Sequence, residues 1–419
     1  MTAAARPTVD RPAFLAGLRA SGVLADARLD RALADVTFAR TARDAAELLV
    51  ASEALTRFQA ERLLAGKSDG FAVGPYVILE HLGKTANGRV FKARHRRMNR
   101  LVAIEILPAV TTAAEGTLDA IRAEARHAAK LTHPNLITLL DVNQLGDRTY
   151  FVKEHLDGAA VSAVSLENGP LAVGAAADMI RQAALGLQHA HEKGVVHGHL
   201  SPVAILVGKG GGGANERPPV KVSGFGLGRF GSVEGTTAGE YRAPEPVPAT
   251  PAADVYALGC VFFHLLAAHP PVLPVPPIRY IRPEVPSAVA ALLAAMLATD
   301  PTARPTAEDV ALRLSAFGDA GTGEHIDLNL PAASYSAATS ILQHTSSASP
   351  FAGMTLEGDP HEQTPVAVPT RKGKPRRAKM PAPRGRSHPL ATASVLLLVA
   401  VGVTVALTLM LKRALAVGH

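Results

Sequence analysis

Two hydrophobic periodicities follow one another along the chain, and their order limits the possible folds. Between residues 74 and 144, short β-type runs predominate, with one helical pattern at 115–131. After about residue 170 the apolar spacing becomes helical, as at 175–193, 254–268 and 287–298. A strand-rich segment followed by a helix-rich segment predicts an α+β protein with two lobes.

Two further segments flank this region. Residues 1–70 are predicted to form a helical N-terminal preface that packs on the next domain, because Asp10 is suited to cap a helix and Phe14 and Leu18 share one helical face. In residues 316–370, Ala, Ser, Thr, Pro and Gly dominate. Such a composition buries too little apolar area to offset chain entropy, so this stretch is predicted to be a disordered linker.

The C-terminal region has the composition of a membrane anchor. Residues 390–411 are a run of 22 residues without a charge, close to the roughly 20 that a helix needs to cross a bilayer. The basic juxtamembrane segment 371–388 holds eight Lys/Arg and no acid, whereas only Lys412 and Arg413 follow the span. The positive-inside rule therefore predicts a single-pass protein of the inner (cytoplasmic) membrane with its N-terminal domain in the cytoplasm. The basic segment is expected to contact anionic headgroups.

The charge distribution argues against a nucleic-acid partner. The chain has a net charge of +7, and without the juxtamembrane segment it sums to 7 − 8 = −1. A nucleic-acid-binding protein is expected to carry its basic residues on the folded domain, interleaved with aromatic residues. Here they lie in one polar run, which points to the membrane.

Nine short segments between residues 74 and 315 are similar to the eukaryotic-type Ser/Thr protein kinase family found in bacteria, and they occur in the family's order. In chain order they are 83-GKTANGRVFKA-93, 102-VAIEIL-107, 121-IRAEARHAAKLTHPN-135, 150-YFVKEHLDG-158, 187-LQHAHEKGVVHGHLSPVAIL-206, 220-VKVSGFGLGR-229, 239-GEYRAPE-245, 254-DVYALG-259 and 300-DPTARPT-306. The resemblance implies the two-lobed protein kinase-like fold. Its small lobe would hold an antiparallel five-stranded sheet and one helix, and its large lobe would be mainly helical.

The residues that carry chemistry in this family are replaced. Glu105 stands where the family has the lysine that pairs with nucleotide phosphates, and His199 stands where it has the catalytic aspartate. Ala204 and Gly224 replace the two metal-binding residues. The resemblance therefore implies that no catalytic set and no metal site is intact.

Other family positions are retained. A vestigial nucleotide pocket is expected from Gly83, Gly88, Val90, Ala103, Lys153 and Glu154. Positions that pair helix ends or brace loops in the family are Glu124, His197, Phe225, Gly226, Glu245, Asp254 and Arg304. The middle glycine of the phosphate loop is absent, and Thr85 takes its place.

The replacements act directly on the binding of ATP. At about 4 Å and an effective dielectric near 20, a lysine beside a phosphate contributes about 4 kcal/mol, and Glu105 reverses the sign. A millimolar ligand is held by only about 4 kcal/mol. We therefore expect no firmly bound cofactor, with ATP lacking productive Mg²⁺ as the one form left open. The alternative is an active Ser/Thr kinase in which His199 is the base and Lys92 or Lys153 supplies the cation.

Lys153 supports a separate hypothesis, because relatives carry an apolar or small residue at this position. Facing Glu105 across adjacent strands, it would form a buried ion pair that fills the phosphate end of the pocket. The competing interpretation is a Lys153 side chain that reaches solvent from a distorted strand.

Three further features of the sequence are weaker indications of function or structure. The histidines of 189-HAHEKGVVHGH-199 do not predict a zinc site, because His189 and His191 are about 200° apart around a helix. Candidate phosphate acceptors are Ser232, Thr236 and Thr237, although Gly198 replaces the arginine that would order them. The stretch 269–287 is proline-rich where members of the similar kinase family usually have another helix, so the resemblance implies a trimmed lower part of the large lobe.

The sequence thus predicts a membrane-anchored pseudokinase, a binding or allosteric module for a protein partner such as an active kinase. The alternatives are the active Ser/Thr kinase with reassigned residues and a passive membrane tether with a degenerate domain.

Overall fold

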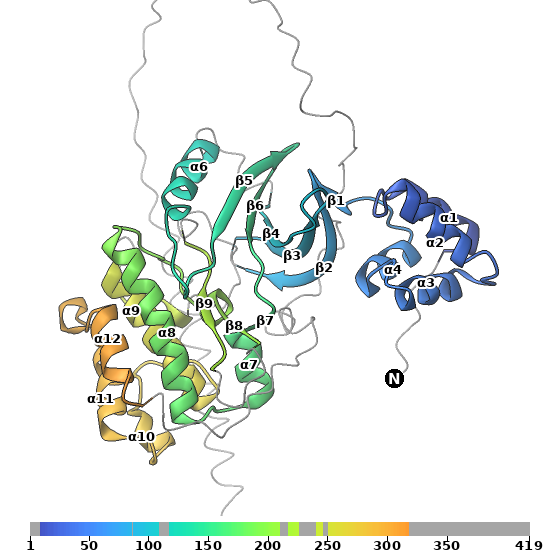
Figure 1. Ribbon diagram of the computed structural model, residues 1–419. Coiled ribbons are helices and arrows are strands. Elements are labelled where there is room, and N and C mark those ends of the chain that lie inside the picture. The colour runs from blue at the N-terminus through green and yellow to red at the C-terminus, as the bar shows by residue number, and fades with distance from the viewer. Residues whose placement is uncertain are drawn as a thin grey trace, which may run out of the picture. The chain divides into compact units, whose positions relative to one another are not determined.

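The computed structural model describes residues 9–85, 87–108, 117–209, 217–225, 240–245 and 250–317 (Figure 1). The predicted linker, juxtamembrane segment and membrane span lie outside these residues, as do Gly226, Ser232, Thr236 and Thr237. Among the described helices, none combines the length and the apolar character needed to cross a bilayer.

Four short helices occupy the N-terminal segment for which helix was expected. They are α1 (Arg11–Ala20), α2 (Asp26–Asp35), α3 (Ala42–Ala51) and α4 (Arg57–Leu64). Their starts follow from local capping: the Asp10 carboxylate accepts the Ala13 N–H at 2.9 Å, and Thr41 and Thr56 each form a reciprocal capping box. Phe14, Leu18 and other apolar residues give the four helices a core of their own.

Helix α4 is attached to the adjacent strand β2 (Tyr76–Lys84) through its first turn. The Thr56 hydroxyl donates to the Leu79 carbonyl, and the Gln59 amide donates to the Ile78 carbonyl at 2.6 Å. Phe58 packs on Phe91 with ring centroids 6.4 Å apart. Polar and aromatic contacts therefore join the N-terminal helices to the sheet.

The small-lobe sheet is antiparallel and has six strands in the order β1-β2-β3-β4-β6-β5. The expected number was five. The additional strand is β1 (Ala72–Val73), a two-residue segment that pairs with the start of β2. The other strands are β3 (Arg89–His95), β4 (Leu101–Ile106), β5 (Leu139–Leu145) and β6 (Arg148–Glu154), and the lobe's helix is α6 (Thr117–Ala128).

The large lobe is mainly helical, as the periodicity predicts. Its helices are α7 (Val161–Asn168), α8 (Val173–Glu192), α9 (Pro251–Ala267), α10 (Ile278–Ile281), α11 (Ser287–Met296) and α12 (Ala307–Leu314), with short turns η1 (Pro202–Ala204) and η3 (Pro301–Ala303). Strands β7 (Gly158–Ala160), β8 (Ile205–Gly208) and β9 (Val220–Val222) form a second sheet. Helix α9 is apolar on all sides and buried along nearly its whole length, which makes it the centre of this lobe. The proline-rich stretch contains only the four-residue α10.

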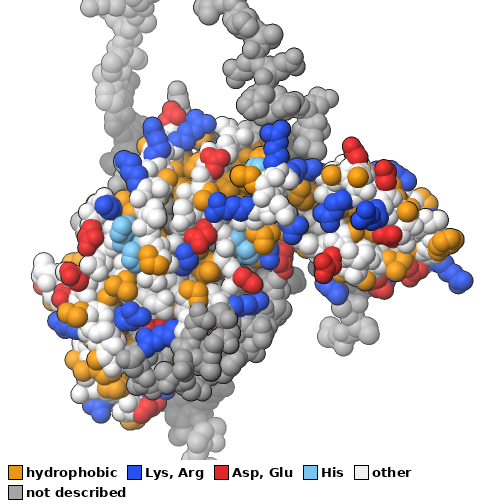
Figure 2. Space-filling view, viewed as in Figure 1, with side chains coloured by type: hydrophobic (Ala, Val, Ile, Leu, Met, Phe, Trp, Pro, Cys, Tyr) orange, Lys and Arg blue, Asp and Glu red, His pale blue; other side chains and the backbone are white. Residues whose placement is uncertain are grey.

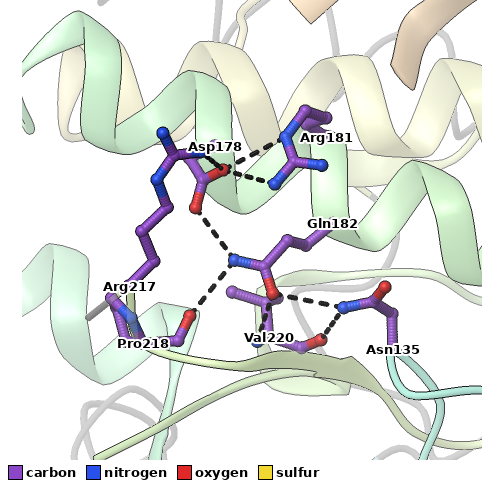
Figure 3. A network of polar contacts seen from close by, with 7 residues as sticks. All are labelled: Asn135, Asp178, Arg181, Gln182, Arg217, Pro218 and Val220. Carbon is purple, nitrogen blue, oxygen red and sulfur yellow. Dashed lines mark hydrogen bonds and ion pairs between the residues drawn. The ribbon is translucent and has the colours of Figure 1, made fainter. Parts of the chain in front are cut away.

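A polar network fastens β9 to α8 (Figure 3). The Gln182 amide donates to Asp178 at 2.9 Å, and its oxygen accepts N–H groups from Val220 (2.9 Å) and Asn135 (3.2 Å). Asn135 also donates to the Val220 carbonyl at 2.8 Å. Asp178 holds both Arg181 and Arg217. Because the amide nitrogen and oxygen of Gln182 are both used, β9 has a fixed position over α8. Gly224 and Phe225, which follow β9, line a small cavity.

The attachment of α4 can be tested at Gln59, which is 2% exposed. Gln59→Ala leaves the Ile78 carbonyl without its donor, so the free energy of unfolding should fall by about 1–3 kcal/mol in urea titrations. The matched control is Gln188→Ala, because that amide reaches only Glu192 at the surface of α8, and a change within about 0.5 kcal/mol is expected there. Equal losses in the two variants would contradict this docking.

Acid sensitivity is predicted at His81, which packs on Phe91 and has a buried Nε2 without a hydrogen-bond partner. Burial, followed by Arg89 and Lys84, lowers the pKa of His81 from 6.5 to about 4. The unfolded chain takes up this proton below about pH 6.5 and the folded chain only near pH 4, so stability should fall with pH between these values. His81→Phe should remove about 1–3 kcal/mol of the loss measured by urea unfolding at pH 7 and pH 4.5, and His127→Phe on the exposed face of α6 should remove none.

Candidate functional site

The candidate site lies on β2, β3, β4 and β6 of the small lobe and on the loop that follows α8. Its central element is a buried ion pair between Glu105 on β4 and Lys153 on β6, in which Lys153 Nζ donates to Glu105 Oε2. Glu105 is 1% exposed and Lys153 is 8% exposed. The pair hypothesised from the sequence is therefore present, and the interpretation in which Lys153 reaches solvent is wrong. Ala103 lies directly opposite Lys153 in the sheet register, which sets Glu105 and Lys153 diagonally on one face.

The second oxygen of the Glu105 carboxylate is taken by the turn between β2 and β3. Thr85 Oγ1 donates to Glu105 Oε1 and also accepts the N–H groups of Asn87 (3.2 Å) and Gly88 (3.3 Å). Thr85 occupies the place of the missing glycine, and no pattern in the sequence predicted that its hydroxyl would bind Glu105. As a result, the turn that would cover a nucleotide is fastened to a carboxylate of the protein itself.

The neighbouring pocket positions have structural roles. A Cβ on Gly88 would lie 2.1 Å from the Ile106 carbonyl oxygen, so only glycine lets β3 start this close to β4. Val90 pairs with Glu105 in the register between β3 and β4, and Gly83 is buried near the end of β2. The packing of the sheet explains the positions of these three residues, and of the predicted pocket residues only Lys153 lines the cavity described below.

The loop after α8 is held by one buried carboxylate. Asp254, in the first turn of α9, accepts the backbone N–H groups of His197 and Gly198, each at 2.8 Å, and is 2.9 Å from His191 Nε2. The His197 imidazole is 2.9 Å from the Ser223 carbonyl, and Phe225 packs edge-on against the ring. Burial lowers the pKa of His197, which keeps the imidazole neutral. The predicted bracing role of Asp254 and His197 is thus visible in the geometry.

The positions where the family places catalysis have no metal-binding chemistry. His199 is exposed, and partial desolvation, followed by His197 and Arg242, lowers its pKa. Ala204 ends η1 and its carbonyl accepts the Ser223 N–H at 2.8 Å. Gly224 has φ +102°, a backbone conformation in which an aspartate would be strained. Carboxylate and amide oxygens are the side-chain ligands that Mg²⁺ prefers, and the side chains at positions 204 and 224 offer neither.

Glu154, at the end of β6, connects the two lobes. Its carboxylate binds Lys221 on β9 at 2.9 Å and accepts the Thr138 N–H at 3.2 Å. Sequence reasoning placed Glu154 in the pocket and missed Lys221.

Two other residues singled out in the sequence lie elsewhere in the small lobe. Lys92, considered as a substitute cation, pairs in the register with Glu80 and Ala103. Glu124 is half-buried on α6.

The lower brace of the large lobe is a two-pronged ion pair. Arg304 Nη1 and Nη2 bind the two Glu245 oxygens at 2.7 and 2.8 Å, and Arg304 Nε donates to the Ala298 carbonyl at 2.8 Å. The guanidinium also lies 4.8 Å from the centre of the Tyr256 ring. Hydrogen bonding from Arg304 lowers the pKa of Glu245. Both residues match the bracing positions predicted from the sequence.

The histidine-rich segment does not converge on one point. His189 stacks on His133 with centroids 5.2 Å apart, while His191 and His197 have the partners described above. Within the described ranges, no group of three His, Cys, Asp or Glu side chains is arranged to hold a metal ion.

A small cavity adjoins the ion pair, with Lys153, Phe151, Leu136, Leu131 and Phe225 among its lining residues. Apart from Lys153, these lining side chains are apolar, and the space holds about one water molecule. The site therefore combines an internally neutralised charge with apolar packing. MgATP does not fit this set of residues: the lysine position is anionic, its carboxylate is already bonded twice, and both metal-ligand positions lack a ligand.

Comparisons with known proteins agree with this architecture. The Pkinase family, described as a protein kinase domain, matches residues 76–313. The chain is 30% identical over 287 residues to the serine/threonine-protein kinase Pkn1 of Myxococcus xanthus, an alignment covering 61% of this chain and 40% of Pkn1. It is 29% identical over 274 residues to PrkC of Bacillus subtilis, covering 59% of this chain and 41% of PrkC. The chain thus spans less than half the length of these curated relatives.

A solved structure shows the same fold. The crystal structure of the Mycobacterium tuberculosis PknI kinase domain superposes with a TM-score of 0.50 and 23% sequence identity. The match covers 59% of this chain and 98% of the PknI domain.

The ion pair predicts a large loss of stability when one charge is removed and recovery when both are removed. Lys153→Met leaves Glu105 buried without its cation, which should lower the free energy of unfolding by about 3–5 kcal/mol in urea titrations. The double variant Lys153→Met/Glu105→Leu removes both charges and should recover to within about 1 kcal/mol of the parent. A single variant as stable as the parent would show that the pair is not desolvated.

Proposed function

The chain belongs to the protein kinase family, and from this premise we propose that it works as a pseudokinase, a kinase-shaped binding module anchored to the cytoplasmic membrane. Its role would be to bind and regulate a protein partner without transferring phosphate. The first partner to test is an active kinase at the same membrane.

The observation that carries the proposal is the state of Glu105. In phosphoryl transfer, a lysine and Mg²⁺ neutralise the charge of the phosphates. Here the corresponding position is a carboxylate whose oxygens already bind Lys153 and Thr85. A triphosphate entering in the usual pose would meet this carboxylate, and it would have to break the Lys153 contact to gain a cation.

The retained residues support a binding function. Asp254, Arg304 and Glu245 hold the loop and helices of the large lobe in place, although the residues that those loops would present to ATP are gone. Retention of the residues that brace the fold, beside replacement of the charged residues of catalysis, is expected for a protein that acts by binding a partner through its surface.

Membrane anchoring is proposed from the composition of 371–388 and 390–411. With the domain held at the membrane, a partner in the same membrane is met at a raised effective concentration, so a weak interface is sufficient.

Nucleotide binding can be measured by thermal shift on the full chain. A ligand at 100 times its Kd stabilises a protein by about 2.7 kcal/mol, which raises the melting temperature. We expect no Mg²⁺-dependent rise with ATP for the parent. Lys153→Met/Glu105→Leu serves as the control in which the charge that repels phosphate is absent. A large Mg²⁺-dependent rise for the parent would contradict the proposal.

Turnover gives the second test. Transfer of radiolabelled phosphate from ATP to a basic protein substrate should stay at background for the parent. If transfer is found, His199→Ala decides its origin: a loss of activity in that variant would identify a kinase with reassigned residues and would replace the pseudokinase proposal. Asp254→Ala, in which the loop loses its carboxylate, marks the behaviour of a misfolded large lobe.

A further inference from the structure

The end of β2 and the β3–β4 hairpin of the small lobe together have a high density of positive charge. Between Glu80 and Glu105 the chain contains seven Lys/Arg and no acid. These residues are Lys84, Arg89, Lys92, Arg94, Arg96, Arg97 and Arg100. Outside the juxtamembrane segment the chain sums to −1, so this is a local concentration of charge that the overall balance hides. In the space-filling view, Lys and Arg side chains are spread over the small lobe (Figure 2).

The tip of the hairpin combines these cations with exposed apolar side chains. Arg94, Arg97 and Arg100 are exposed, and none of them forms an ion pair with another described residue. Between them, Met98 is 67% exposed and Leu101 is 37% exposed. The tip therefore presents two apolar side chains to solvent among three cations.

The tip is an ordered turn. The Met98 N–H donates to His95 Nδ1 at 3.1 Å, and the His95 N–H donates to the Arg100 carbonyl at 2.9 Å. Asn99 has φ +53°, which closes the turn. Arg96 points back and donates to the Gly22 carbonyl at 2.6 Å, which fastens the base of the turn to the N-terminal helices. The backbone of the tip is therefore held in place before any ligand binds, which lowers the conformational entropy lost on binding.

The chemistry of this tip selects one kind of partner. Cations flanking a protruding apolar side chain match an anionic lipid surface, where the charges meet headgroups and the apolar group enters the interface. Nucleic acid is a poorer fit, because single strands are bound by exposed aromatic side chains. The one aromatic ring on β3, Phe91, is 2% exposed and turned into the sheet.

We propose that the β3–β4 hairpin is a membrane-docking surface that binds anionic phospholipid headgroups through Arg94, Arg97 and Arg100, with Met98 inserted at the interface. The proposal goes beyond the pseudokinase function and would hold even for an active kinase. It uses the proposed anchor at 390–411 only as a tether. A flexible linker of 55 residues, as the composition of 316–370 predicts, would span about 40 Å root-mean-square, so the proposed anchor would not hold the folded part in one orientation.

The chain allows a clean labelling experiment. Its single cysteine, Cys260, is 0% exposed in α9, and burial raises the pKa of this thiol to about 12, so it does not react with thiol reagents. Met98→Cys therefore accepts one environment-sensitive fluorophore at the tip. The labelled full chain is placed in nanodiscs made of phosphatidylcholine alone or with phosphatidylserine.

The emission maximum should shift to the blue only in nanodiscs with phosphatidylserine. At high salt it should return to the wavelength of the undocked tip, because salt screens the attraction to the headgroups. Adding Arg97→Glu and Arg100→Glu should lower the ratio of docked to undocked tip by at least about tenfold. The matched control is Arg279→Glu with Arg313→Glu, which makes the same change of charge at exposed positions of the large lobe and should leave the shift intact. A label at Leu312→Cys, on exposed α12, should not shift.

Each other outcome overturns the inference. A shift that is absent, equal in both lipids, or unchanged by Arg97→Glu/Arg100→Glu excludes headgroup recognition by the hairpin. A shift caused by soluble polyglutamate or single-stranded DNA, but not by lipid, assigns the surface to an acidic protein or a nucleic acid instead. If the chain does not enter nanodiscs, the anchor proposal fails, and the same labelled chain mixed with phosphatidylserine vesicles tests the hairpin by itself.

Discussion

A carboxylate that is removed from water needs a cation or hydrogen-bond donors as partners, and this requirement organises the sheet of the small lobe around Glu105. Glu105 is almost completely removed from water, so Lys153 must extend inward from β6, and Thr85 must direct the adjoining turn toward β4. The three side chains come from β4, β6 and the turn between β2 and β3. One charge reversal on β4 therefore determines both what fills the pocket and how the turn above it is held. Under the proposed function, this arrangement competes with phosphate binding, because a phosphate would need the cation that Glu105 already holds.

The large lobe shows why some family positions are retained in this chain although others are replaced. The partners of Asp254 are two backbone N–H groups, and Arg304 binds both Glu245 and backbone carbonyls. Removing either residue would leave buried polar groups unsatisfied in the protein itself. Residues that bind only a metal or a nucleotide have no such partner in the folded chain, so their replacement by Ala204 and Gly224 leaves the fold intact.

The sequence predicted the fold well where the signal is local or repeated. The periodicities give the strands and helices of both lobes, Asp10 caps α1 as expected, and the motif order gives the two-lobed architecture. The sixth strand was missed because β1 has two residues, too few for any alternation to appear. In the site, the partnership of Glu105 with Lys153 could be hypothesised because opposite charges at unusual positions suggest each other. The hydroxyl of Thr85 could not, since a threonine in a turn has many ordinary explanations.

Composition alone determined that this chain has a folded core, a polar linker-like stretch and an uncharged run of 22 residues, because these properties are sums over neighbouring residues. The order of the residues also determined which chemical groups are absent from the positions where the kinase family has its catalytic and metal-binding residues. Tertiary structure decided the partners: that Lys153 turns inward, that Lys221 reaches Glu154, and that three arginines and Met98 share one exposed turn. Partners follow from distances between residues far apart in the chain, and those distances exist only after strands and helices have packed.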